Sequence, residues 1–162
     1  MLIGIMSDSH DHRENMAKAV KIFNDLKVDA VYHAGDICSP HLLENILDLR
    51  STFDAVFGNS DVQKTSFLKL NGGRFNFHAL TWEWELEGYK FAMAHKPEDL
   101  QRLISQGGFA CGIHGHTHHS VSHKVEGTFI LNPGEVCGHR TGKATVMTLE
   151  IPTFRHQLIG LK

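Results

Sequence analysis

The chain has 162 residues, of which 41% are hydrophobic and 21% charged, and its formal net charge is -2 at pH 7. This length suits a single domain, which we predict over residues 1–162. The small negative charge argues against dedicated nucleic-acid binding, and no apolar run approaches the roughly 18 residues of a membrane span. The apolar residues Met1 to Met6 are too few for a signal peptide, so we expect a cytoplasmic protein.

The first third of the chain alternates short apolar runs with segments of helical periodicity. Strands are predicted at Leu2–Met6, Ala30–Ala34 and Ala55–Phe57, and helices at Asp11–Leu26 and from Pro40 to Leu49. A strand–helix–strand order of this kind predicts parallel pairing of the strands.

The remainder is rich in predicted strands. Trp82–Glu87 alternates strictly between apolar and polar residues, and a helix is predicted at Pro97–Gln106. Further strands are predicted at Tyr89–Ala94, Cys111–His114, Ser120–Val125, Thr128–Leu131, Ala144–Ile151 and Arg155–Leu161. This pattern predicts two packed sheets with helices outside. Trp82 and Trp84 share one strand face, which is either an outward patch suited to a homodimer or an ordinary core face.

Side chains that can bind metals follow five of the predicted strands. They are Asp8-Ser9-His10, Gly35-Asp36, Gly58-Asn59-Ser60-Asp61, His95 and Gly115-His116-Thr117-His118. Ligands bind at the carboxyl ends of strands in open α/β sheets, so we expect the five groups to converge. In the Asp-x-His and His-x-His pairs, residues two apart in extended chain point the same way. The glycines remove a side chain where the backbone turns sharply.

The donor types indicate which metals suit such a site. The three cysteines, Cys38, Cys111 and Cys137, show no CxxC spacing, so we expect neither a disulfide framework nor a thiolate zinc site. Histidine is unusually frequent, with 13 copies. Oxygen and nitrogen donors suit Mn, Fe, Co, Ni, Zn or Mg. Each motif alone is weak, since a Gly-Asp after a strand is often a plain turn, but their joint order indicates one site.

Taken together, the five motifs resemble the calcineurin-like metallophosphoesterase superfamily, whose pattern is D-x-H, GD, GN-x-(D/E), H and GHxH. The chain is especially similar to the small single-domain phosphodiesterases of the YfcE type, whose Asn-Pro-Gly turn is matched by Asn132-Pro133-Gly134. The resemblance implies a four-layer αββα sandwich of two mixed sheets flanked by helices. It also implies two divalent transition-metal ions, with Mn, Ni, Co, Fe or Zn favoured over Mg.

The resemblance further implies a ligand set and a reaction. One ion would be held by Asp8, His10, Asp36 and His118, and the other by Asp36, Asn59, His95 and His116. Asp36 would bridge the two ions, which in such sites lie about 3.5–4 Å apart, clamp a phosphate ester and generate a hydroxide nucleophile. Asp8, Asp36, Asn59 and His95 would act in catalysis through the metal-bound water.

Several residues lie beside this pattern. Ser60 stands where many members have a histidine thought to protonate the leaving group, and serine is a poor acid at neutral pH, so no general acid is assigned. Asp61 is expected to orient a histidine ligand. His139 is expected to line the site, and His33, within an apolar strand, to be a buried residue with satisfied hydrogen bonds. The other candidates for a proton donor are His119 and His12.

The leading hypothesis is a metal-dependent phosphodiesterase that acts on a small phosphate ester. One alternative is a catalytically weak protein-binding scaffold of the same fold, as the eukaryotic retromer subunit is. Another is a phosphomonoesterase or nucleotidase. All seven expected ligands are present, which favours catalysis over the scaffold, whereas the choice of substrate depends on the shape of the pocket.

Overall fold

Buried strands from the N-terminal third form the centre of a six-stranded mixed sheet. The strands of this sheet are β1 (Leu2–Met6), β2 (Ala30–His33), β3 (Thr52–Ala55), β4 (Phe75–Phe77), β10 (Thr145–Glu150) and β11 (Arg155–Gly160). They lie in the order β11-β10-β1-β2-β3-β4. β1, β2 and β3 pair in parallel, as predicted, β4 adds parallel to β3, and the β10–β11 hairpin adds antiparallel to β1.

Residues 81–132 contribute the strands of a five-stranded mixed sheet. Its strands are β5 (Thr81–Leu86), β6 (Tyr89–Ala94), β7 (Cys111–Ile113), β8 (Val121–Val125) and β9 (Thr128–Asn132). They lie in the order β5-β6-β7-β9-β8. The central strands β6, β7 and β9 run parallel, so their carboxyl ends meet at one edge of the sheet.

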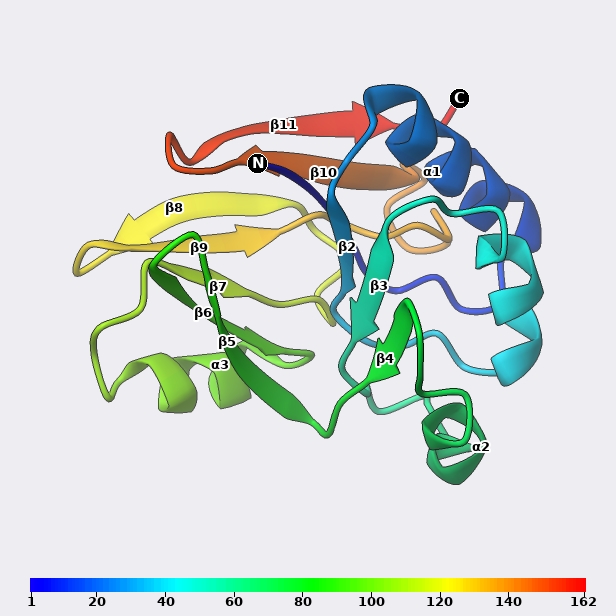
Figure 1. Cartoon of the computed structure of the whole chain (residues 1–162), viewed down its shortest axis with the longest axis horizontal. Coiled ribbons are helices and arrows are strands. Elements are labelled where there is room, and N and C mark those ends of the chain that lie inside the picture. The colour runs from blue at the N-terminus through cyan, green and yellow to red at the C-terminus, as the bar shows by residue number, and fades with distance from the viewer.

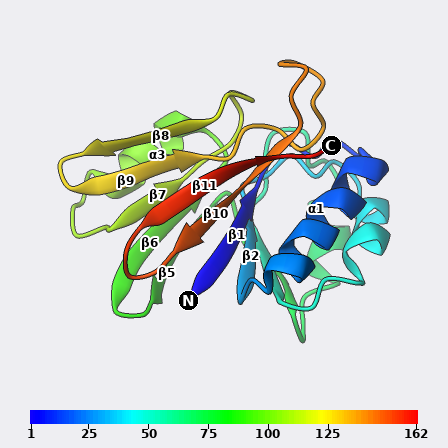
Figure 2. The same cartoon turned by 90° about the horizontal axis from the view of Figure 1, so that it is seen from above.

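The computed structural model describes residues 1–162 and shows four layers (Figure 1). The helices are α1 (Arg13–Leu26), η1 (Pro40–Ile46), α2 (Lys64–Leu68) and α3 (Pro97–Ile104). Figure 2 shows α1 outside the six-stranded sheet and α3 outside the five-stranded sheet, with the two sheets between them. This arrangement confirms the predicted αββα sandwich. None of the helices is long and apolar enough to span a bilayer.

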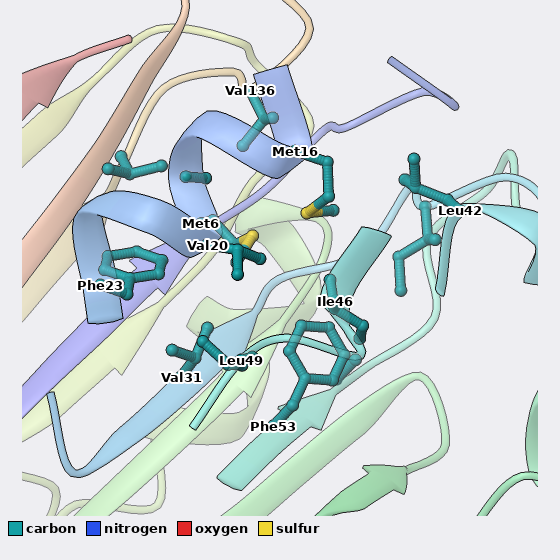
Figure 3. Close-up of a cluster of buried hydrophobic side chains, with 14 of the residues drawn as sticks. Met6, Met16, Val20, Phe23, Val31, Leu42, Ile46, Leu49, Phe53 and Val136 are labelled. Atoms are coloured by element: carbon teal, nitrogen blue, oxygen red, sulfur yellow. The ribbon is translucent and has the colours of Figure 1, made fainter. Parts of the chain in front are cut away.

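The packing of α1 fixes the loop that follows β1. Met16, Val20 and Phe23 project from one face of the helix into a buried cluster that includes Val136, and Figure 3 shows these side chains gathered between helix and sheet. The Phe23 ring lies against Gly4 of β1, where a Cβ would collide with it. Burial of each such side chain contributes about 1.5–3 kcal/mol. The helix and β1 are thus held together on either side of the loop that carries Asp8.

Some boundaries differ from the prediction. The segment from Pro40 forms a 3₁₀ helix that ends at Ile46, and Leu47, which follows it, is 56% exposed instead of facing the core. β3 ends at Ala55, where a strand was predicted to begin. The short elements α2 and β4 were not predicted, because five and three residues are too few to show a period.

The two tryptophans of β5 face inward. The rings of Trp82 and Trp84 pack on the cluster between the sheets, with centroids 5.9 and 4.8 Å from that of Tyr32. The core-face alternative is therefore correct. This orientation removes the observation on which the predicted homodimer depended, and the homodimer itself stays a prediction.

Candidate metal centre

The five motif loops meet at the carboxyl ends of the parallel strands of both sheets. Backbone hydrogen bonds join adjacent loops: Asp8 N donates to Gly35 O and His10 N to Asp36 O, both at 3.0 Å. Gly115 N donates to the carbonyl of His95 at 3.0 Å in the other sheet. The two sheets are connected by His116 N, which donates to Asp8 Oδ2 at 3.1 Å. The predicted convergence at one edge is confirmed.

The backbone at these motifs is left-handed. Five of the seven predicted ligands have positive φ: Asp8 (51°), His10 (41°), Asp36 (60°), His116 (67°) and His118 (64°). The Asp-x-His and His-x-His pairs therefore do not lie in extended chain, and our argument from strand alternation was wrong. Left-handed backbone costs a non-glycine residue about 1–3 kcal/mol and concentrates at functional sites, where the surrounding structure maintains it.

Asp8, His10 and His118 form one group of converging donor atoms. The Nε2 atoms of His10 and His118 lie 3.8 and 3.4 Å from Asp8 Oδ1, and the two imidazole rings stack with centroids 5.3 Å apart. Asp8 Oδ1 and His10 Nε2 are buried and make no hydrogen bond. Buried polar atoms are normally paired, so these two atoms lack a partner that a cation would supply.

Asp36, His95 and His116 form an adjoining group. Asp36 Oδ2 lies 3.4 Å from His95 Nε2 and 3.6 Å from His10 Nε2, between the two groups. His116 Nδ1 lies 3.3 Å from His95 Nε2. Two donors on one tetrahedral ion with bonds of about 2.1 Å are about 3.4 Å apart, so these separations fit shared metal ions. Asn59 is exposed and lines the cavity beside them.

The electrostatics of the two groups favour positive charge. The nearby Asp8 carboxylate and the Cys38 thiol raise the pKa of His10 to about 10. Burial lowers the pKa of His95, but the Asp36 carboxylate outweighs it and the net shift is upward. Burial raises the pKa of Asp36, yet His95 and the hydrogen bonds from Ser60 hold it well below its usual range. The carboxylates of the two groups thus favour the positively charged form of both histidines.

Residues of the third motif, Gly58-Asn59-Ser60-Asp61, hold Asp36 in position through hydrogen bonds. Ser60 donates to both Asp36 oxygens, from its N at 2.8 Å and its Oγ at 2.9 Å. Asp61 is buried and accepts the N–H groups of Asp36, Cys38 and Gly58, at 3.0, 2.7 and 2.7 Å. It therefore fixes the backbone of two motif loops and does not contact a histidine ligand, so its predicted partner was wrong.

Glycine is required at positions 58 and 115 because neighbouring side chains lie too close to leave room for a Cβ. A Cβ on Gly58 would overlap the carboxylate of Asp36, and one on Gly115 would overlap Ser7 Oγ. Neither glycine has a positive φ, so the sharp turn expected at these positions is not the reason for them. Their function is to let the ligand-bearing loops come close together.

Buried hydrogen bonds also hold the histidines. His95 Nδ1 donates to the carbonyl of Ala34 at 2.8 Å, and His10 Nδ1 lies 3.3 Å from Cys38 Sγ. Each bond leaves Nε2 facing the donor groups, as is typical of metal-binding imidazoles. His33 is buried and bonded to Ser9 Oγ at 2.9 Å and Gly35 N at 3.1 Å, as predicted, and burial lowers its pKa to about 4.

Two residues near the Asn-Pro-Gly turn were missed as site residues. Asn132 is buried at the end of β9, and its amide donates to Gly115 O and Thr117 Oγ1, both at 3.0 Å, which holds the His116–His118 loop. Glu135 is fully buried, and its Oε2 accepts a hydrogen bond from His118 Nδ1 at 2.6 Å. The available signal was an asparagine at a sixth strand end, followed three residues later by a carboxylate.

A cavity of about 400 Å³ opens onto the centre. Its lining contains no hydrophobic side chain and consists of His10, Asp36, Asn59, Ser60, His116, His118, His139 and Arg140. Asp8 and His95 lie behind this surface and are almost fully buried. His139 and Arg140 are both exposed at the cavity, so the segment after the turn contributes to its wall. His12 and His119 do not line it.

An αββα sandwich with aspartates and histidines gathered at its strand ends defines a metallophosphoesterase-type site. The chain belongs to the calcineurin-like phosphoesterase superfamily, whose domain model matches residues 1–153. It is 36% identical over 167 residues to the protein named phosphodiesterase MJ0936 from Methanocaldococcus jannaschii, with full coverage of both chains.

Solved structures agree with this assignment. A structure described as a novel archaeal phosphodiesterase superposes with a TM-score of 0.91 at 34% identity, over 99% of this chain and 100% of that one. The phosphoesterase YfcE from E. coli superposes with a TM-score of 0.75 over all of both chains. Its identity of 18% shows likeness of fold alone.

Proposed function

We propose that this protein is a phosphodiesterase that binds two divalent transition-metal ions. Asp8, His10, Asp36 and His118 would hold one ion, and Asp36, Asn59, His95 and His116 the other. The full-length similarity to a protein named as a phosphodiesterase supports the reaction class. The absence of thiolate among the donors supports Mn, Ni, Co, Fe or Zn.

One observation carries the proposal. Asp8 Oδ1 and His10 Nε2 are buried without hydrogen bonds in a group whose other donor atoms also point at the same space. Burying unpaired polar atoms costs about 1–3 kcal/mol each, and a structural role would not require it. A bound cation satisfies both atoms at once. The position of Asp36 Oδ2 between the two histidine groups supports a bridging role.

When bound, a pair of divalent ions polarises phosphoryl oxygens and lowers the pKa of water. The residues of the chain then bind and orient the ester. The polar cavity admits a phosphate group with solvated substituents, and His139 is placed to contact it. The Ser60 hydroxyl is already donated to Asp36, so it positions that carboxylate and is not free to protonate a leaving group.

The test is hydrolysis of bis(p-nitrophenyl) phosphate and of p-nitrophenyl phosphate after dialysis against chelator and addition of Mn, Ni, Co, Zn or Mg. We expect diester cleavage that requires metal, with Mn or Ni exceeding Mg because imidazole ligands suit softer ions. Asp48→Asn, at an exposed site away from the cavity, is the control for Asp36→Asn. Full turnover in excess EDTA would contradict the proposal, and faster cleavage of the monoester would favour a phosphomonoesterase.

The cytoplasmic location also stays a prediction. Its support is chemical: all three cysteines are free thiols, which is typical of proteins from reducing compartments.

A further inference from the structure

Glu135 makes an unusual number of contacts for one side chain. It is 0% exposed, and both carboxylate oxygens are used. Oε2 accepts from His118 Nδ1 at 2.6 Å and from Cys137 Sγ at 3.1 Å. Oε1 accepts from Thr141 N at 2.6 Å, from Thr141 Oγ1 at 2.8 Å and from Arg140 N at 2.9 Å. The Arg140 N–H also reaches Oε2, at 3.2 Å, but the shorter bonds of the two oxygens serve two different parts of the site.

The Oε2 contact sets the orientation of His118. With Nδ1 donating to Glu135, Nε2 is the free imidazole nitrogen, and it faces Asp8 Oδ1 at 3.4 Å. Carboxylates behind ligating histidines fix the tautomer and the ring angle, and their removal commonly costs about 10–100-fold in metal affinity.

The Oε1 contacts hold the segment that forms one wall of the cavity. Gly138 and Gly142, with φ of 71° and 72°, stand at the two ends of this segment. Between them, the backbone N–H groups of Arg140 and Thr141 turn inward to Glu135, and both His139 and Arg140 line the cavity. The guanidinium of Arg140 forms no ion pair, which leaves it free for an anion.

We propose that Glu135 is a positioning residue that couples the orientation of His118 to the placement of Arg140, and that Arg140 binds the anionic phosphate group of the substrate. The assignment of a phosphate substrate to Arg140 rests on the proposed function, whereas the predicted effect of Glu135 on metal affinity does not. The cavity lining contains no other lysine or arginine, so Arg140 supplies its only permanent positive charge.

The chemistry of glutamine makes the coupling testable. A carboxylate offers acceptors on both sides, but an amide at position 135 offers one acceptor and one donor. In Glu135→Gln the NH₂ group must face either His118 Nδ1–H or the N–H groups of Arg140 and Thr141, which are also donors. One side of the coupling is therefore lost at nearly constant volume.

The experiment measures Mn²⁺ affinity by chelator competition and, separately, kcat and KM for bis(p-nitrophenyl) phosphate. The variants are Glu135→Gln, Thr141→Val and Arg140→Ala, with the exposed Glu85→Gln as control. We expect Glu135→Gln to weaken Mn²⁺ binding by about 10–100-fold if the amide NH₂ faces His118, and to raise KM by about tenfold or more if it faces Arg140 and Thr141. Thr141→Val and Arg140→Ala should raise KM by about tenfold or more and leave Mn²⁺ affinity within about twofold, since a lost charge-assisted hydrogen bond is worth about 1.5–3 kcal/mol.

Wild-type Mn²⁺ affinity together with a wild-type KM in folded Glu135→Gln, or an unchanged KM in Arg140→Ala, would overturn the coupling. If Glu135→Gln does not fold, Thr141→Val decides. It removes the Thr141 Oγ1 bond to Glu135 and keeps the two backbone N–H donors, so an unchanged KM would overturn the claim that this side-chain bond helps to place Arg140. If the parent protein cleaves no diester but Glu135→Gln still weakens Mn²⁺ binding, the positioning of His118 stands and the proposed function fails.

Discussion

Metal binding should displace a proton from His10, and this can be tested without substrate. The Asp8 carboxylate and the Cys38 thiol raise the pKa of His10 to about 10, so the imidazole of the metal-free protein is protonated at neutral pH. Its Nε2 must lose that proton before it can bind an ion. Addition of metal at pH 7.5 should therefore release at least one proton per protein, with His95 adding to this number because its pKa is also raised.

The pH dependence of affinity follows from the same shift. Below pH 10, displacement of one proton makes the apparent affinity rise tenfold for each pH unit. Between pH 6.5 and pH 8.5 the predicted change is about 100-fold, or about 2.7 kcal/mol at 1.36 kcal/mol per unit. An unshifted histidine, with a pKa near 6.5, would release almost nothing at pH 8.5.

Titration calorimetry with Mn²⁺ in buffers of different ionisation enthalpy measures the released protons directly. The slope of the observed enthalpy against the buffer enthalpy should be at least one proton at pH 7.5. His123→Ala removes an exposed histidine away from the centre and should leave the slope unchanged. A slope of zero in the unmodified protein, or an affinity that does not change between pH 6.5 and 8.5, would refute the reasoning.

Three further outcomes are expected. Asp36→Ala should lose both metals in elemental analysis, because Asp36 Oδ2 lies between the two histidine groups, whereas Asn59→Ala should retain one; equal losses would argue against a bridging carboxylate. Because the Ser60 hydroxyl donates to Asp36, it should not protonate a leaving group. Alkyl diesters, whose leaving groups need that proton, should therefore react far more slowly than aryl diesters, since general acid assistance typically accelerates such a step by about 10²–10⁴-fold. A flat dependence of log rate on leaving-group pKa would assign the proton to another residue, with His139 tested first. The free energy of unfolding of the metal-free protein should fall by about 2 kcal/mol as pH rises from 6.5 to 10, after allowance for solvent screening. The reason is that the raised pKa of His10 stabilises the fold only while the ring is protonated. An unfolding free energy that stays constant over that pH range, measured with denaturant, would contradict this role of His10.

Local signals in the sequence predicted much of the fold and the candidate site. β1 and β6 have the predicted bounds, because each is a short apolar run with a clear end. The five motifs meet at one edge, since parallel strands necessarily align their carboxyl ends. The residue types at those ends also indicated metal chemistry, because aspartate, asparagine or histidine stands at each of them.

The tertiary structure alone decided which groups support that chemistry. Asp61 bonds to backbone N–H groups, which no residue pattern reveals, and the inward face of Trp82 and Trp84 was set by the packing of one sheet on the other. His118 and Glu135 are 17 residues apart and follow different strands. A sequence can show which side chains stand at strand ends, because that order is local. The direction in which each donor points depends on left-handed turns and sheet packing, and these are fixed only when the whole chain has folded.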